Sequence, residues 1–125
     1  MADGYARASN SPGVILAGQN GPGATNLVTG IAQAAAAFSP LVSIAGSFST
    51  KDKLQDAFQG IDQQSLFNPI TKKTWTITET KKIPKIFSKA FNLAMSPRRG
   101  PVQLNLPRNI LSESAKFNID QNDKS

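Results

Sequence analysis

The stretch GVILAGQNGPGATN, residues 13–26, joins a short apolar run to a glycine-rich turn. The run is continuous, contains β-branched side chains and follows Pro12, which is typical of a strand buried in a parallel sheet. The turn then stands at the carboxyl end of this strand, where open α/β sheets bind their ligands. The stretch therefore predicts a strand, a ligand-binding turn and the start of a helix.

The rest of the chain repeats this alternation of elements. Short apolar runs predict strands, and apolar residues three or four positions apart predict helices, the first of which is opened by Pro22. The predicted strands cover residues 13–18, 41–46, 74–78 and 102–106, the predicted helices cover residues 22–37 and 83–95, and a polar connection with a helical turn near residues 52–57 covers residues 47–65. This order predicts a doubly wound α/β fold, with a mainly parallel sheet and helices on both faces.

The length of 125 residues predicts one domain. Residues 1–8 have helical character but no strand before them, so we expect the domain, over residues 1–108, to lack its first βα unit. Residues 109–125 are polar with few apolar anchors, and they are predicted to be a linker toward a central domain.

The composition excludes several kinds of chemistry. Cysteine and histidine are absent, so disulfides, Cys/His zinc sites and His-based triads are excluded, and catalysis would need carboxylates, amides, hydroxyls or a cofactor. The net charge is +6, but the basic residues are spread out without aromatic platforms, so we expect a solvated surface and no nucleic-acid partner. No apolar run reaches membrane-span length, and Asp3 and Arg7 follow Met1 closely, so a cytoplasmic protein with no membrane partner is expected.

The glycine-rich turn matches neither of two common phosphate-binding motifs. It lacks the GxGxxG spacing, and no lysine follows its last glycine as in a P-loop. Taken alone, the Gly-Pro-Gly sequence over residues 21–23 is a tight connection between a strand and a helix. Its function has to be inferred from the segments around it.

Six segments occur in one order along the chain. They are MADGYAR (1–7), NGPGATNLVTGIA (20–32), SPLVSIAG (39–46), DAFQ (56–59), NPITK (68–72) and GPVQLNLPR (100–108). Together they resemble the pyrimidine-binding domain of the acetolactate-synthase-like thiamine-diphosphate enzymes. The resemblance implies thiamine diphosphate as cofactor, Mg²⁺ held by another domain, a 2-oxo acid or aldehyde substrate, and a homodimer or homotetramer whose subunits share each active site. The cofactor of such enzymes performs the carbanion chemistry.

The resemblance also implies roles for individual residues. The residues implied in cofactor binding are Gly21, Pro22, Gly23 and Asn26, and those implied in substrate binding are Phe58 and Gln59. The family's proton relay uses a glutamate that the resemblance places upstream of Met1, so no catalytic residue and no metal ligand is expected within residues 1–125. Helix capping by Asn26 and plain packing by Phe58 are the alternatives for these two residues.

The segments divide between two enzymes of the group. Gln19-Asn20, the pattern FQ-x-x-x-Q-x-x-LF over residues 58–67 and the ending GPVQLNLPR resemble sulfoacetaldehyde acetyltransferase, which transfers an acetyl group to phosphate and releases sulfite. GATNLVTGIA and DAFQ resemble acetolactate synthase, which decarboxylates pyruvate and joins the product to a second 2-oxo acid. The acetyltransferase is our first expectation and the synthase the alternative. A non-catalytic binding module that keeps the fold is a further alternative.

Overall fold

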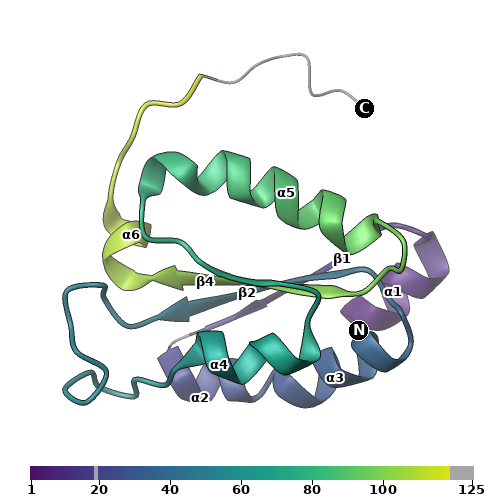
Figure 1. Ribbon diagram of the computed structural model, residues 1–125, viewed down its shortest axis with the longest axis horizontal. Coiled ribbons are helices and arrows are strands. Elements are labelled where there is room, and N and C mark those ends of the chain that lie inside the picture. Colours follow the sequence, from purple (N-terminus) through teal and green to yellow (C-terminus); the bar gives the residue numbers. More distant parts are fainter. Residues whose placement is uncertain (19, 119–125) are drawn as a thin grey trace.

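The computed structural model describes residues 1–18 and 20–118 as a four-stranded parallel sheet with helices on both faces (Figure 1). The strands lie in the order β1-β2-β4-β3, and every neighbouring pair is parallel. The strands are β1 (Gly13–Ala17), β2 (Leu41–Ser47), β3 (Thr74–Thr76) and β4 (Pro101–Pro107). The predicted doubly wound α/β fold is confirmed.

Six α-helices and two short 3₁₀ turns connect and cover these strands in the described part of the chain. The helices are α1 (Ala2–Ser9), α2 (Asn20–Thr25), α3 (Val28–Ala36), α4 (Gln63–Phe67), α5 (Ile83–Met95) and α6 (Arg108–Ser112), and the 3₁₀ turns are η1 (Asn68–Ile70) and η2 (Thr80–Lys82). Figure 1 shows α5 above the sheet and α2, α3 and α4 below it.

Alternation along β2 builds a separate core on each face of the sheet, because successive side chains of a strand point to opposite faces. Leu41 and Ala45 pack with buried residues of α2, α3 and α4, such as Ile31. Val42 packs on the other face against α5, where Ala90 is fully buried. The two cores hold the carboxyl ends of β1, β2 and β4 at one edge of the sheet.

The sequence predicted one helix over residues 22–37, and this prediction is wrong in its continuity. The chain forms α2 and α3, with a break at Asn26 and Leu27. The Leu27 amide donates to the Ala24 carbonyl oxygen, three residues back, at 3.0 Å, so the last turn of α2 tightens and the axis is interrupted. The regular apolar spacing continues through the break, which is why periodicity could not locate it.

Two further differences concern the connections. The helical turn predicted near residues 52–57 consists of hydrogen-bonded turns without a helix, and the same polar connection contains the unpredicted α4. The linker predicted over residues 109–125 begins inside α6, whose Ile110 is buried. Residues 119–125 of this predicted linker lie outside the described residues.

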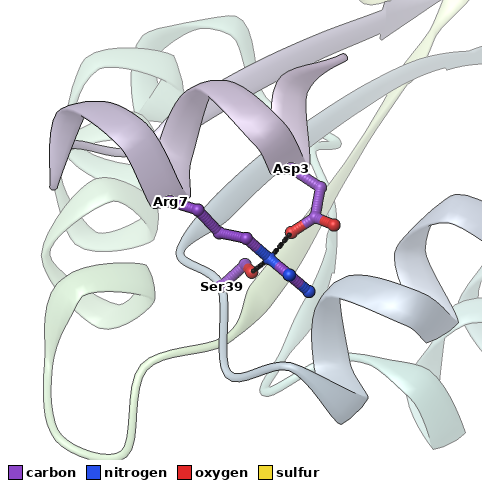
Figure 2. Close-up of polar contacts among 3 residues, drawn as sticks. All are labelled: Asp3, Arg7 and Ser39. Atoms are coloured by element: carbon purple, nitrogen blue, oxygen red, sulfur yellow. Dashed lines mark hydrogen bonds and ion pairs between the residues drawn. The ribbon is translucent and has the colours of Figure 1, made fainter.

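The MADGYAR segment forms α1 and is tied to the chain entering β2 (Figure 2). Arg7 Nε donates to Asp3 Oδ1 at 3.2 Å, one helical turn away, and to Ser39 Oγ at 3.4 Å. Ser39 is almost fully buried. This contact fixes α1 at the amino-terminal edge of the sheet, the opposite edge from the glycine-rich turn.

Candidate functional site

The glycine-rich turn and the Phe58-Gln59 segment are hydrogen-bonded to each other at the carboxyl edge of the sheet. The Gly21 amide donates to the Gln59 carbonyl oxygen at 2.9 Å, and Asn20 Nδ2 donates to the Phe58 carbonyl oxygen at 3.1 Å. The first segment was predicted to bind the cofactor and the second to bind the substrate, and their direct pairing was not predicted. The backbone of one segment therefore positions the other.

Two glycines of the turn are required by close packing. A Cβ at Gly21 would lie 2.4 Å from Ile61 Cδ1 and 2.6 Å from the Gln59 carbonyl oxygen. A Cβ at Gly23 would lie 2.7 Å from the Gly18 carbonyl oxygen, where α2 meets the end of β1. Since backbone atoms cannot move aside cheaply, both positions need a residue without a side chain.

A cavity of about 510 Å³, the carboxyl-edge cavity, opens beside this turn. Its lining residues are Leu16, Ala17, Gly18, Asn20, Ile44, Gly46, Ser47, Leu106, Arg108 and Leu111. They come from the ends of β1, β2 and β4, from the turn into α2 and from α6, and they include no carboxylate. The cavity can hold an apolar group but offers no acid or base of its own.

The lining of the carboxyl-edge cavity is mainly apolar. Leucine and isoleucine side chains supply apolar walls, and a Cβ added at Gly18 or at Gly46 would enter open space, so the two glycines leave room in the cavity. Binding pockets are typically apolar with a few placed polar groups, here Ser47, the Asn20 amide and the Arg108 guanidinium. The residues present are therefore compatible with the pyrimidine ring of thiamine diphosphate.

The remaining predicted site residues lie on the surface. Pro22 and Asn26 are exposed, and the Pro22 carbonyl oxygen accepts hydrogen bonds from Thr25 Oγ1 at 3.0 Å and from the Asn26 amide at 3.3 Å. Asn26 makes no side-chain cap for α3, whose N-cap position is Leu27. Phe58 is 76% exposed, and Gln59 is exposed with a φ of 55°. Phe58 and Gln59 are thus presented outward, and packing does not account for the Phe58 side chain within this chain.

A buried cluster of amides beneath the site was missed by the sequence analysis. Gln63 Nε2 and Gln103 Nε2 each donate to Asn105 Oδ1 at 3.0 Å, and all three residues are at most 3% exposed. Gln103 and Asn105 are two positions apart in β4, so they share one face of the sheet and were visible as a polar pair inside an apolar strand. The third residue, Gln63, lies in α4. A glutamine does not contribute to an apolar pattern, so nothing in the sequence predicted that it would be buried.

A second cavity, of about 230 Å³, lies between this amide cluster and the connection after β2. Its walls include Phe48, Leu54, Asp62 and Gln63. Two hydrogen bonds from Ser65 hold the pKa of Asp62 below its usual value. The bond from the Ser65 hydroxyl has the larger effect, and the bond from the Ser65 amide has the smaller one. Asp62 is thus the ionised N-cap of α4.

Two features bear on metals and membranes. Within residues 1–18 and 20–118, no group of three or more Asp, Glu, His or Cys side chains is placed to hold a metal ion. In the same described ranges, no helix has the length and apolar character needed to cross a membrane.

Comparison with known proteins gives consistent matches. The family model described as "Thiamine pyrophosphate enzyme, N-terminal TPP binding domain" matches residues 1–66. The chain is 48% identical over 120 residues to the probable acetolactate synthase large subunit of Methanococcus aeolicus, which is 96% of this chain and 20% of that protein. It is 44% identical over 117 residues to the acetolactate synthase isozyme 3 large subunit of Escherichia coli, which is 94% of this chain and 20% of that protein. The chain thus spans about a fifth of the length of these relatives.

Proposed function

Since this chain belongs to the thiamine pyrophosphate enzymes, with residues 1–66 matching their N-terminal TPP binding domain, we propose that it works as part of an acetolactate synthase. The relatives favour this alternative over the sulfoacetaldehyde acetyltransferase that the sequence motifs placed first. The proposed reaction is decarboxylation of pyruvate followed by carboligation to a second 2-oxo acid. When bound, thiamine diphosphate supplies the carbanion chemistry, and the protein supplies binding and orientation.

The identity to acetolactate synthase large subunits over nearly the whole chain is the observation that carries this proposal. The structure adds the hydrogen bond from the Gly21 amide to the Gln59 carbonyl oxygen. It joins the turn proposed to contact the pyrimidine ring to the segment proposed to approach the substrate. The turn would hold the ring through backbone at Gly21 and Gly23, beside the apolar walls of the carboxyl-edge cavity. Phe58 and Gln59 would then face the reacting carbon across a subunit interface, which their exposure supports.

The carboxyl-edge cavity has no carboxylate in its lining, so we propose that the relay glutamate, the Mg²⁺ ligands and the diphosphate site lie in other parts of the complete enzyme. A homodimer or homotetramer would bring these parts together. The chemistry assigned to the described residues is therefore positioning and exclusion of water, without proton transfer.

The test is a paired assay of the protein expressed from its complete reading frame, with thiamine diphosphate and Mg²⁺. Acetolactate formation from pyruvate, without sulfite release from sulfoacetaldehyde and phosphate, is the expected result. Sulfite release without acetolactate would overturn the proposal in favour of the acetyltransferase. If calorimetry detects no binding of thiamine diphosphate and neither product forms, the non-catalytic module is the correct reading.

A further inference from the structure

A pocket of about 240 Å³ lies at the amino-terminal edge of the sheet, away from the site described above. Its walls come from the end of α3, from η1 and the segment that follows it, and from the turn that leads into β4. We call it the amino-edge pocket. Because all four strands are parallel, this edge is the opposite one from the carboxyl-edge cavity. A ligand there would not contact the glycine-rich turn.

The amino-edge pocket is lined by three cationic side chains, Lys72, Arg98 and Arg99, and by no carboxylate. In the described part of the chain, the ion pairs are Arg7 with Asp3 and Lys82 with Glu79, so no acidic residue neutralises the three cations. Three like charges around one small pocket repel one another, and an anion between them would relieve that repulsion.

The cationic side chains are held in place by the protein. The guanidinium carbon of Arg98 lies 4.7 Å from the centre of the Phe38 ring, and Arg99 Nη1 donates to the side-chain oxygen of Asn10. Lys72 Nζ donates to the Leu93 carbonyl oxygen at 2.5 Å, to Ser96 Oγ at 2.8 Å and to the Ser96 carbonyl oxygen at 3.0 Å. These bonds use all three donors of the ammonium group, so Lys72 contributes charge to the pocket and the two arginines contribute the free N–H donors. Side chains that are already ordered lose little entropy when a ligand binds.

The Lys72 side chain also packs against Gly100 in the turn before β4. A Cβ at Gly100 would lie 3.2 Å from Lys72 Cγ, so glycine lets the lysine stem pass against the backbone. Burial lowers the pKa of Lys72, and an anion nearby would oppose this shift by stabilising the ammonium form.

We propose that the amino-edge pocket binds the anionic group of a small molecule, a phosphate or a carboxylate, at a site separate from that of the cofactor. Arginine guanidinium groups match both anions because their N–H donors form a planar fork. The volume of about 240 Å³ is below the range usual for drug-sized ligands, so the pocket suits one compact anionic group. This inference stands independently of the proposed synthase activity.

The test is calorimetric titration of the protein from its complete reading frame, at low ionic strength and saturated with thiamine diphosphate and Mg²⁺ to fill the cofactor's own site. Inorganic phosphate and acetate are the two probes, because each carries a single compact anionic group. Saturable binding of either probe is expected, and the tighter one tells whether phosphate or carboxylate is preferred. No saturable binding of either probe overturns the proposal.

The double variant Arg98→Gln/Arg99→Gln is expected to weaken the tighter probe about tenfold or more, since hydrogen bonds to charged groups are lost. The matched control Lys85→Gln/Lys89→Gln removes the same charge from exposed positions of α5, and a change below about twofold is expected. Equal weakening by the two double variants would show that net charge alone attracts the probe, which contradicts the pocket. Arg98→Gln alone keeps the Arg99 contact with Asn10, and it serves as the decisive variant if the double variant does not fold.

Discussion

At Gly21 the absence of a Cβ lets the Gln59 carbonyl oxygen and the Ile61 side chain approach the start of α2. The site depends on this approach, because it fixes the exposed Phe58-Gln59 segment relative to the turn. An added methyl group at Gly21 would be too close both to the Ile61 side chain and to the Gln59 carbonyl oxygen. The Ile61 side chain can rotate away, but the carbonyl oxygen can move only if the backbone near Gln59 moves.

We expect Gly21→Ala in the complete enzyme to raise the thiamine-diphosphate activation constant about tenfold. The added methyl group would overpack the turn at a cost of roughly 1–3 kcal/mol, and residues 59–61 would be displaced. The measurement is the initial rate of product formation against cofactor concentration. Gly30→Ala is the control, since Gly30 is exposed in α3 and its Cβ would meet nothing within 4 Å. An unchanged activation constant in folded Gly21→Ala protein would show that the turn does not position the site.

Asp62 gives a prediction about pH. Its pKa is held below the usual value of 3.8 by hydrogen bonds from the Ser65 hydroxyl and amide. A lowered carboxyl pKa stabilises the fold at pH values above 3.8, and this stabilisation is lost as the pH falls through the lowered pKa. We expect Ser65→Ala to raise the pKa of Asp62 toward 3.8, because the hydroxyl donor is lost, and NMR titration of the Asp62 carboxyl carbon measures this. Ser88→Ala, on the exposed side of α5, should leave it unchanged.

Helix α4 is attached to the sheet by amide hydrogen bonds as well as by apolar contact. We expect Asn105→Ala to lower the free energy of unfolding by about 2–4 kcal/mol, because it leaves the buried Gln63 Nε2 without its acceptor and removes one from Gln103 Nε2. Denaturant unfolding measures the loss. Asn92→Ala, at an exposed position of α5, should cost less than about 0.5 kcal/mol. Equal losses in the two variants would show that the amide cluster does not stabilise the fold.

The elements that were predicted well are those in which apolar residues form a regular helical or strand pattern along the whole element. Helix α5 begins and ends where its apolar spacing predicts, at Ile83 and Met95, and the four strands differ from their predicted bounds by two residues at most. Helix α4 was missed because it is short and buries a glutamine, which has no apolar periodicity. The roles of the turn and of Phe58-Gln59 came from the family resemblance, and spacing alone could not show that they pair.

Considered as a whole, the chain leaves one face of β1 open. Val14 is 50% exposed and Leu16 is 74% exposed, on the edge strand of the sheet. An edge strand with apolar side chains favours pairing between molecules. We expect Val14→Thr/Leu16→Thr to reduce self-association of the 125-residue chain several-fold, measured by light scattering after size exclusion, because both substitutions remove apolar surface and keep residues tolerated in strands. Leu54→Thr, at an exposed loop position, is the control and should change little.

The isolated 125-residue chain is expected to show no turnover of pyruvate or of sulfoacetaldehyde, even with thiamine diphosphate and Mg²⁺. The physical reason is that the carboxyl-edge cavity has no carboxylate in its lining, and no metal-binding cluster lies within residues 1–18 and 20–118. A coupled assay for acetolactate and for sulfite measures this directly, with the complete enzyme as the positive control. Product formed by the isolated chain would show that its own residues carry the proton transfer.

The strand order also determines how quickly the sheet can assemble. Strands β3 and β4 are neighbours in the chain and are separated mainly by η2 and α5. Strands β2 and β4 pair Leu41 with Pro101, so the chain between these two residues, which includes β3, has to form a loop. Joining β2 to β4 closes a much longer loop, and the entropy lost in closing a loop grows with its length. Formation of the β2-β4 ladder should therefore limit the folding rate, and until it forms β2 presents an unpaired edge in the middle of what becomes the sheet.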